Sequence, residues 1–404
     1  MGPNGDNIST EPIASKWPAS GPQKIWEQKV GVGYSSPIAL DGKVYLLYQV
    51  GAQDTLTAFD ANTGNKVWSQ AYECGVPADR SGPQDTNPDS GMPLVLATPA
   101  IDGDKIYTYG GGGDLVCRNL ADGSAIWHIN VLKELNERIL QWAQSSSPLV
   151  TDKVVYVSAG KGGPAAVMVD KTNGRILWKS QAENGGYAAP ILADVGGVQQ
   201  LVIFGNQALI GMNPQTGQTL WSFPWTNRAQ VNAATPIYHD GHLFISSDYQ
   251  TGCMMLSLTP NGATKDWQKR DIQQKFQPGV LDHDYYYVNS GGTLKCMHWP
   301  DGKIVWEASD PKLRLNEGGS IVRDGDKLIT MSERGKLSLV KATPQGYAVI
   351  SQMQLFDFGQ VWSSPLIYRD RLYTMGKDTL ICLDIGPQAA LAPGSPDYLV
   401  ARSR

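Results

Sequence analysis

Cysteine and histidine are scarce in this sequence, whose 404 residues contain only five of each. No two cysteines are adjacent and no CxxC spacing occurs, so the pattern gives no support to a zinc site. Charge is also sparse, because charged residues make up 18% of the chain and the net charge is −4. Without a basic excess the chain has no field that would condense on a phosphate backbone, which excludes nucleic acid as an expected partner.

Long apolar runs are absent as well. No stretch approaches the roughly 18 residues that a membrane-spanning helix needs, so no transmembrane segment is predicted. The start, MGPNGDNIST, lacks the basic and apolar regions of a signal peptide, so we expect either a cytosolic protein or an exported one whose signal has been removed. Glycine is abundant, at 44 residues, and the hydrophobic fraction is 41%. These values indicate a folded, turn-rich protein.

A repeated pattern runs through most of the chain: two small residues and a proline, an apolar run, a glycine turn and a tryptophan. The first copy begins at Ser35, Ser36 and Pro37 and passes the turn at Gly64 to reach Trp68. Later copies end at Trp127, Trp178, Trp221, Trp267 and Trp306, so that successive tryptophans lie 59, 51, 43, 46 and 39 residues apart. These intervals bracket the ~40–45 residues of a four-stranded propeller blade.

The last two copies are incomplete. The seventh has Val349 in place of tryptophan, and the eighth begins at Ser363 and stops after Asp384. The segment around Trp26 has the character of a tryptophan strand with no repeat before it, and we expect it to close the ring as the outer strand of the eighth blade. The predicted fold is all-β, an eight-bladed propeller of four-stranded blades. Its expected parts are an N-terminal extension 1–22, the propeller 23–386 and a C-terminal tail 387–404.

The segments DTLTAFDANTGNKVW, GDLVCRNLADGSAIW, AAVMVDKTNGRILW and ALIGMNPQTGQTLW resemble PQQ-like repeats, in which a strand and an Asp precede a T-G or D-G turn and a Trp. The resemblance covers nearly the whole chain. The repeat family includes alcohol dehydrogenases that depend on pyrroloquinoline quinone (PQQ), the BamB scaffold of outer-membrane barrel assembly, and exported bacterial PQQ-binding-like β-propeller repeat proteins. The resemblance therefore implies a periplasmic or secreted protein whose signal peptide has been removed.

Family members that use PQQ hold it against a pair of adjacent, disulfide-bonded cysteines and bind calcium through carboxylate and amide oxygens. This sequence has no such pair. Cys117, Cys296 and Cys382 occupy one repeat position in three blades and are expected to be free, buried thiols. Trp142 and Trp362 are candidates for a stacking face, and Glu317, Asp248 and Asp378 are candidates for calcium ligands. PQQ and calcium thus have candidate ligands but no complete motif, and the interpretation leans away from an enzyme.

The repeat register predicts where a site would lie. Residues just before the inner strands should converge at one mouth of the central channel, together with the turns between second and third strands. The expected ring is Tyr34, Gln144, Tyr187, Asn232, Gln277, Glu317 and Trp362, and the expected turn residues are Lys161, Asp248, Glu333, Arg334, Lys377 and Asp378. Such side chains suit a small polar ligand such as a sugar. The alternative is that a wet channel needs them only to satisfy strand ends and water.

Two insertions should lie beside that mouth: residues 69–96, rich in Pro, Gly and Asp, and residues 130–143, where Leu132, Leu135, Ile139 and Leu140 follow helical spacing after Asn130 as N-cap. The sequence thus predicts a monomeric, exported, non-catalytic propeller that binds a protein partner or a small polar ligand at its central funnel. The alternative function is a periplasmic quinoprotein-type or sugar-active enzyme that uses the same funnel.

Overall fold

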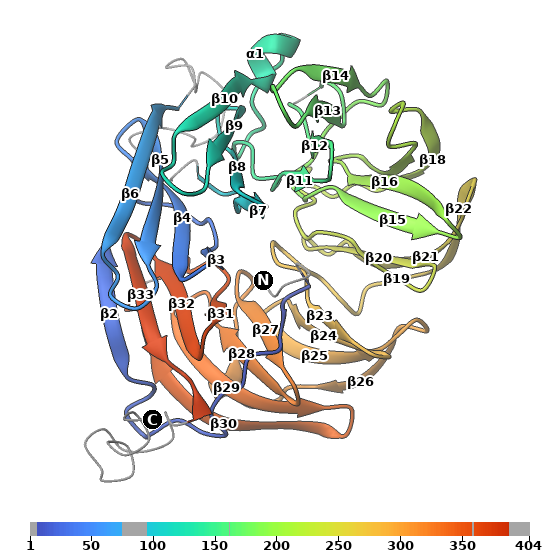
Figure 1. Ribbon diagram of the computed structural model, residues 1–404. Coiled ribbons are helices and arrows are strands. Elements are labelled where there is room, and N and C mark those ends of the chain that lie inside the picture. The colour runs from blue at the N-terminus through green and yellow to red at the C-terminus, as the bar shows by residue number, and fades with distance from the viewer. Residues whose placement is uncertain (1–5, 75–94, 161, 358, 388–404) are drawn as a thin grey trace.

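Eight mainly antiparallel sheets surround a central axis in the computed structural model, which describes residues 6–74, 95–160, 162–357 and 359–387. Each sheet is a blade, with its first strand nearest the axis and its last strand at the rim (Figure 1). This arrangement confirms the predicted all-β, eight-bladed propeller. In the part of the chain that the structure describes, no helix has the length and apolar character that crossing a membrane requires.

The first half of the ring follows the repeat copies in order. Blade 1 contains β3 (Ile38–Leu40), β4 (Lys43–Val50), β5 (Gln53–Asp60) and β6 (Lys66–Glu73). Blade 2 contains β7 (Ala100–Asp102), β8 (Lys105–Tyr109), β9 (Asp114–Asn119) and β10 (Ala125–Asn130). Blade 3 contains β11 (Leu149–Val150), β12 (Val154–Val157), β13 (Val167–Asp170) and β14 (Ile176–Lys179). Blade 4 contains β15 (Ile191–Val195), β16 (Val198–Phe204), β17 (Ala208–Met212) and β18 (Thr219–Pro224).

The second half contains the two blades that use N-terminal strands. Blade 5 contains β19 (Ile237–His239), β20 (His242–Ser247), β21 (Gly252–Thr259) and β22 (Gly262–Lys269). Blade 6 contains β23 (Val280–Asp282), β24 (Tyr285–Ser290), β25 (Thr293–His298) and β26 (Lys303–Glu307). Blade 7 contains β27 (Ser320–Asp324), β28 (Lys327–Met331), β29 (Lys336–Thr343), β30 (Gly346–Gln354) and the added β1 (Ile8–Ser9). Blade 8 contains β31 (Leu366–Tyr368), β32 (Arg371–Gly376), β33 (Thr379–Asp384) and the N-terminal β2 (Lys24–Lys29).

The ring closes as the sequence predicts, because β2 pairs antiparallel with β33 as the outer strand of blade 8. Upstream of β2, the chain crosses blade 7 toward the axis (Figure 1). There β1 runs parallel to β27, the innermost strand of that blade, with Ile8 opposite Arg323. Residues 6–22, expected as an extension, therefore pack against the blades.

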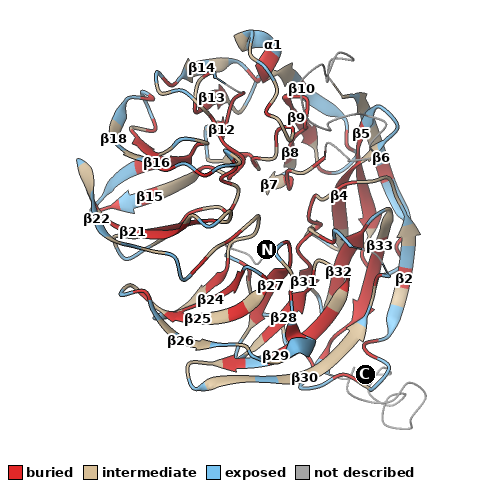
Figure 2. Ribbon diagram, turned by 180° about the vertical axis from the view of Figure 1, so that it is seen from behind, coloured by how far each residue is buried: buried red, intermediate tan, exposed pale blue. Residues whose placement is uncertain are grey.

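The core lies between neighbouring blades, and buried residues concentrate on the middle strands while exposed ones mark the rim (Figure 2). A recurring trio explains the repeat tryptophans. In blade 2, Tyr107, Cys117 and Trp127 are register partners on three successive strands. The small cysteine leaves room for both rings, whose centroids lie 6.0 Å apart. The predicted free thiols Cys117, Cys296 and Cys382 are all buried and occupy this middle position.

Most repeat tryptophans also hydrogen-bond to the next blade, whereas Trp221 donates its Nε1–H to Gln200 Oε1 within blade 4. Trp68 donates its Nε1–H to the carbonyl oxygen of Leu120 in blade 2 at 3.1 Å, and Trp178 donates to that of Pro214 in blade 4 at 3.1 Å. The turn glycine of the next blade lies against the ring. Gly217 has a φ of +70°, and a Cβ there would come within 2.7 Å of Trp178. The turn glycine and the tryptophan recur together in the copies of the repeat because the two residues pack against each other across such an interface.

The interface between blades 7 and 8 lacks a repeat tryptophan, since Val349 occupies that position. Trp17 from the N-terminal segment belongs to the hydrophobic cluster of this interface and is only 4% exposed. Its backbone N–H donates to Ser351 Oγ at 3.0 Å, and Ala14 N–H donates to the carbonyl oxygen of Ile385 at 2.8 Å. The N-terminal segment thus supplies the large aromatic side chain that the seventh repeat does not have.

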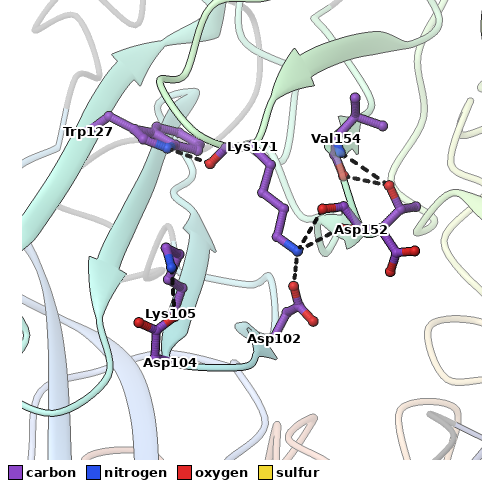
Figure 3. A network of polar contacts seen from close by, with 8 residues as sticks. Asp102, Asp104, Lys105, Trp127, Asp152, Val154 and Lys171 are labelled. Carbon is purple, nitrogen blue, oxygen red and sulfur yellow. Dashed lines mark hydrogen bonds and ion pairs between the residues drawn. The ribbon is translucent and has the colours of Figure 1, made fainter.

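Ion pairs add a second connection between blades. Lys171, in the turn after β13 of blade 3, pairs with Asp102 at the end of β7 in blade 2 (Figure 3). The same ammonium donates to the carbonyl oxygen of Thr151 at 2.8 Å, while the carbonyl oxygen of Lys171 accepts the Nε1–H of Trp127 at 2.9 Å. Lys171 therefore joins blades 2 and 3 through both its backbone and its side chain.

The helix predicted within residues 130–143 is much shorter than its apolar spacing indicates. Helix α1 covers Val131–Leu135, with Asn130 as the predicted N-cap, accepting from the N–H of Lys133. Asn136 ends it in the left-handed conformation, with φ at 54°. Ile139 and Leu140 lie beyond that cap, so the helical assignment of this part is wrong. Most of the other insertion, residues 75–94, lies outside the described residues, as does the tail from residue 388 onward.

Candidate functional site

A cavity of about 930 Å³ lies along the axis of the ring. Its wall comes from the inner strands of several blades, and its apolar part includes Leu149, Ile191, Ile237 and Leu281. The repeated small residues and prolines before these strands, among them Ser147 and Pro148, also line it. Bulky side chains at these positions would fill the axis, so the small-small-Pro motif of the repeat is what leaves the space open.

Three aromatic side chains meet at the end of the cavity where the inner strands begin. Trp362 precedes β31, Tyr34 precedes β3 and Phe276 precedes β23. The ring centroids of Tyr34 and Trp362 lie 4.4 Å apart, and those of Phe276 and Trp362 lie 4.7 Å apart. We call these three residues together with Glu333, which also lines the cavity, the mouth cluster.

Glu333 lies in the turn between β28 and β29 and holds the mouth cluster together. Its Oε1 accepts the Nε1–H of Trp362 at 2.8 Å, and its Oε2 accepts the N–H of Gly318 at 3.3 Å. Burial, with a further contribution from the charge of Glu333, raises the pKa of Tyr34 to about 12, so the phenol is neutral. Within the described ranges, Glu333 forms no ion pair. A half-buried carboxylate is therefore held by neutral donors alone.

Lys275 is the cation on the cavity wall, and its charge is already engaged. Its Nζ lies 2.7 Å from Glu317 Oε2 and 5.5 Å from the ring centre of Phe276. Burial lowers the pKa of Lys275, but the hydrogen bond and charge of Glu317 outweigh this effect and leave it raised. Lys275 is therefore a charged, ion-paired group whose main role in this geometry is to hold Glu317 beside the mouth.

A second aromatic group faces the mouth cluster from blades 3 to 5. Trp142, Tyr187 and Tyr249 line the cavity and share a small hydrophobic cluster with Leu140 and Val231. The backbone N–H of Trp142 donates to the hydroxyl oxygen of Tyr187 at 3.4 Å. Blades 3 to 5 lie across the axis from blades 7, 8 and 1 (Figure 1). Aromatic side chains thus border the same cavity from opposite sides of the ring.

The N-terminal segment reaches the cavity beside blade 7. Asp6 and Asn7 line it immediately before β1, and the carbonyl oxygen of Asn7 accepts the N–H of Arg323 at 2.9 Å. Arg323 lies near the end of β27, while the mouth cluster surrounds the beginning of the inner strands. The segment therefore narrows the channel at the end away from the mouth cluster.

The structure places the predicted ring residues in two groups. Tyr34, Tyr187, Gln277 and Trp362 line the cavity. Gln144 and Asn232 are fully buried and are not among the lining residues. The side chain of Asn232 instead braces loops, donating from Nδ2 to the carbonyl oxygen of Gly205 at 2.8 Å and accepting from Ser247 Oγ at 2.6 Å. Glu317 is exposed and pairs with Lys275 beside the mouth.

The predicted turn residues likewise divide into those at the cavity and those away from it. Glu333 lines the cavity, and Asp248 is half-buried next to Tyr249, with its pKa raised by burial. Arg334 and Lys377 are exposed, while Asp378 pairs with Lys29 of β2 at 2.9 Å. Lys161 lies outside the described residues. Together with the ring residues, these positions show that Tyr34, Tyr187, Gln277, Glu333 and Trp362 are the predicted site residues that line the cavity, four of them between blades 6, 7, 8 and 1.

Sequence reasoning overlooked several residues of the site. Phe276 and Lys275 precede the degenerate sixth copy, in which the repeat register predicts that Gln277 faces the channel. The aromatic residue Phe276, directly before Gln277, was the sequence feature that could have indicated this part of the site. Asp6 had no signal, because it reaches the cavity only through the pairing of a two-residue strand, β1.

The residues present do not fit PQQ and calcium. PQQ carries carboxylates, whereas the charged residues that the structure describes on the cavity wall are Asp6, Lys275 and Glu333, and Lys275 is engaged by Glu317. Cys117, Cys253, Cys296 and Cys382 are buried free thiols, and no cysteine is among the described lining residues. No group of three or more His, Cys, Asp or Glu within the described ranges is placed to hold a metal ion. Trp142 and Trp362 do line the cavity, but their surroundings do not supply the remaining contacts of a quinone site.

Comparison with known proteins agrees with the fold. BamB from Moraxella catarrhalis is similar with a TM-score of 0.64 at 15% identity, over 90% of this chain and 97% of that chain. Quinohemoprotein alcohol dehydrogenase from Comamonas testosteroni is similar with a TM-score of 0.65 at 13% identity, over 94% of this chain and 79% of that chain. The computationally designed Ika8 protein is similar with a TM-score of 0.60 at 9% identity, over 90% of this chain and 98% of that chain. At these identities the likeness shows the fold alone.

A family model gives the stronger result. The model described as outer membrane protein assembly factor BamB matches residues 10–133 and 80–308, which is more than half of the 404 residues. No curated protein matches the sequence significantly. The tryptophan interfaces, the eight blades and this match lead to one conclusion: the chain belongs to the family of PQQ-repeat β-propellers described by the BamB model.

Proposed function

We propose that this protein is a non-catalytic binding propeller whose ligand occupies the central cavity at the mouth cluster. The observation that carries the proposal is the mouth cluster itself, in which Tyr34 and Phe276 pack against Trp362 and Trp362 donates to a half-buried carboxylate, Glu333, on the wall of an axial cavity. Binding sites for small molecules are typically concave, apolar and aromatic, with a few fixed polar groups. The cavity has this composition.

The histidines support a role without catalysis. Each of the five pairs with an Asp side chain, and none lines the cavity; the pairs are His128 with Asp114, His239 with Asp240, His242 with Asp266, His283 with Asp282 and His298 with Asp301. General acid–base chemistry needs a titratable group within hydrogen-bonding reach of the reacting atoms. Glu333, whose oxygens accept from Trp362 and Gly318, serves as an anchor in this arrangement.

Partner binding at the rim is a second candidate function. The residue before a repeat tryptophan is apolar and exposed in several outer strands: Val67 by 47%, Ile126 by 45%, Leu177 by 39% and Val305 by 39%. These positions place apolar side chains around the circumference, where a protein partner has access to them. The family description as an assembly factor supports a scaffold of this kind. It also supports a periplasmic or secreted location, which we propose for this chain.

A ligand screen tests the proposal. Thermal shifts of the wild-type protein would be measured against a library of small molecules, and hits would be repeated on Trp362→Leu and on the rim variant Ile126→Ser. The proposal predicts hits that stabilise the wild type and Ile126→Ser, fail on Trp362→Leu, and are recovered chemically unchanged. Hits that are converted to product, or that stabilise Trp362→Leu equally, would overturn it.

A further inference from the structure

We propose that the mouth cluster binds an organic cation, an alkylammonium group whose apolar remainder extends into the cavity. The inference rests on the proposed function, because it names the chemistry of the ligand that the same cavity would take. Neither the family model nor the structural relatives supply this ligand class. We infer the cationic ligand from three features of the cavity wall: its charged residues, its aromatic surfaces, and the hydrogen bonds that its polar groups already make.

The charge on the described part of the cavity wall disfavours anions. Among the described residues, Asp6, Lys275 and Glu333 are the charged lining residues, and Lys275 pairs with Glu317 at 2.7 Å. Glu333 accepts hydrogen bonds from Trp362 and Gly318, and its charge contributes to raising the pKa of Lys275. The mouth therefore has two carboxylates, Glu333 and Glu317, against one ammonium group, and an anion beside Glu333 would meet like charge in a partly desolvated space.

The aromatic surfaces favour a cation over a neutral molecule. Trp362 is the best of the aromatic side chains at attracting a cation through its ring face, and Tyr34 and Phe276 contribute weaker attraction. The indole N–H of Trp362 donates to Glu333 Oε1 at 2.8 Å. This bond to a carboxylate increases the electron density of the indole ring and keeps its orientation fixed. An ammonium group against Trp362 would therefore lie close to both the ring and a carboxylate.

Hydrogen bonds that are already made argue against a sugar, the ligand first expected from the sequence. The hydroxyl of Tyr34 donates to Gln360 Oε1 at 3.2 Å, and Gln277 Nε2 donates to the carbonyl oxygen of Trp362 at 3.0 Å. These bonds occupy polar groups that would otherwise bind sugar hydroxyls. Along the inner strands the wall includes the apolar side chains of Leu149, Ile191 and Ile237, beside small hydroxyl residues such as Ser147 and Thr235. The lining thus matches a cationic head joined to an apolar body.

Choline and its uncharged analogue 3,3-dimethylbutan-1-ol form a matched pair of probes, because they share their shape and differ in charge. Isothermal titration should show that choline binds the wild type about tenfold more tightly than the alcohol. In Glu333→Gln, which keeps the side-chain shape, the preference should fall to about twofold. Glu307→Gln is the matched control, since Glu307 lies on the outer strand β26 and pairs with Lys295. That variant should keep the wild-type preference.

The possible results separate this inference from the proposed function. If the alcohol binds as tightly as choline and both are lost in Trp362→Leu, the cavity is a binding site but the cation inference is wrong. If Glu333→Gln keeps the full preference for choline, the carboxylate does not recognise the charge and the inference is also wrong. Absence of choline binding to the wild type, or tighter binding of maltose or benzoate in the same assay, would overturn it as well. The library screen would still test the cavity independently.

Discussion

Trp26 and Cys382 face each other across β2 and β33, the strands that join the two ends of the ring. The ring of Trp26 lies 5.7 Å from that of Tyr373, centroid to centroid, on the far side of the cysteine strand. Its Nε1–H donates to the carbonyl oxygen of Ala61 in blade 1 at 3.0 Å. One side chain therefore completes blade 8 and fastens it to blade 1.

Removal of residues 1–30 should open the ring. Without β2, the strand β33 becomes an edge with unpaired backbone groups, and such edges lead to aggregation. The deletion also removes Trp17 from the interface between blades 7 and 8. We expect a lower melting temperature and larger species in size-exclusion chromatography with light scattering. A truncated protein with the wild-type elution volume and melting temperature would show that β2 does not close the ring.

Trp178→Ala should destabilise the protein more than Trp362→Ala. Trp178 packs against Gly217 and donates to the carbonyl oxygen of Pro214 in the next blade, so its loss should cost about 3–5 kcal/mol. Trp362 borders the cavity and contacts Tyr34 and Phe276, which have solvent on one side. Urea denaturation should give a clearly smaller loss for Trp362→Ala. Equal losses would make Trp362 a core residue of the interface.

The thiols should differ sharply in reactivity. Burial raises the pKa of Cys296 and of Cys382 to about 12, and it also raises the pKa of Cys117. Because the thiolate is the reactive form, these three should react with a thiol reagent at about pH 8 only after unfolding. Cys74, which is partly exposed, should react in the native state. Rapid native labelling of the buried three, located by peptide mapping, would contradict the blade register.

Asp54 should make the protein less stable as the pH rises. Burial raises its pKa from 3.8 to about 7, opposed by a hydrogen bond from Tyr72 and supported by the charge of Asp114. The folded state then binds more protons than the unfolded state between about pH 4 and pH 7, so stability falls across that range and is constant above it. The free energy of unfolding should fall by roughly 2–4 kcal/mol less between about pH 4 and pH 7 in Asp54→Asn than in the wild type. Urea denaturation at several pH values measures this difference.

A turn aspartate provides the control for that measurement. Hydrogen bonds from Thr63 lower the pKa of Asp60, so its contribution is present at neutral pH and is lost as the pH falls. Asp60→Asn should therefore change the pH dependence in the opposite sense to Asp54→Asn. That change falls below about pH 4, so Asp60→Asn should keep the wild-type slope between about pH 4 and pH 7. If Asp54→Asn also keeps that slope, Asp54 is not the group responsible.

The repeat predicted the blades because its residues make the same contacts in most copies. At five of the eight interfaces a turn glycine such as Gly217 lies against a tryptophan such as Trp178, so their spacing along the chain reports the spacing of the blades. The position of Trp17 could not be predicted in this way, because its partners in blades 7 and 8 lie more than 300 residues away in the sequence, as its bond to Ser351 shows.

The site was harder to predict because the register fixes where a residue lies but not where its side chain points. Asn232 stands at the predicted position, yet its amide bonds with Gly205 and Ser247 and is buried among loops. Phe276 lies one residue before Gln277, the position that the degenerate copy predicts to face the channel, and both residues line the cavity. Helix α1 stops early for a related reason, since apolar spacing cannot reveal that Asn136 adopts a left-handed cap.

A crystal soaked in arsenocholine would locate a cation bound to the mouth cluster. Arsenocholine keeps the shape and charge of choline, and its arsenic atom gives an anomalous signal in a crystal of the wild-type protein. We expect an anomalous peak in the axial cavity, within about 6 Å of the ring of Trp362. Peaks confined to the rim of the propeller, with none beside the mouth cluster, would contradict this expectation.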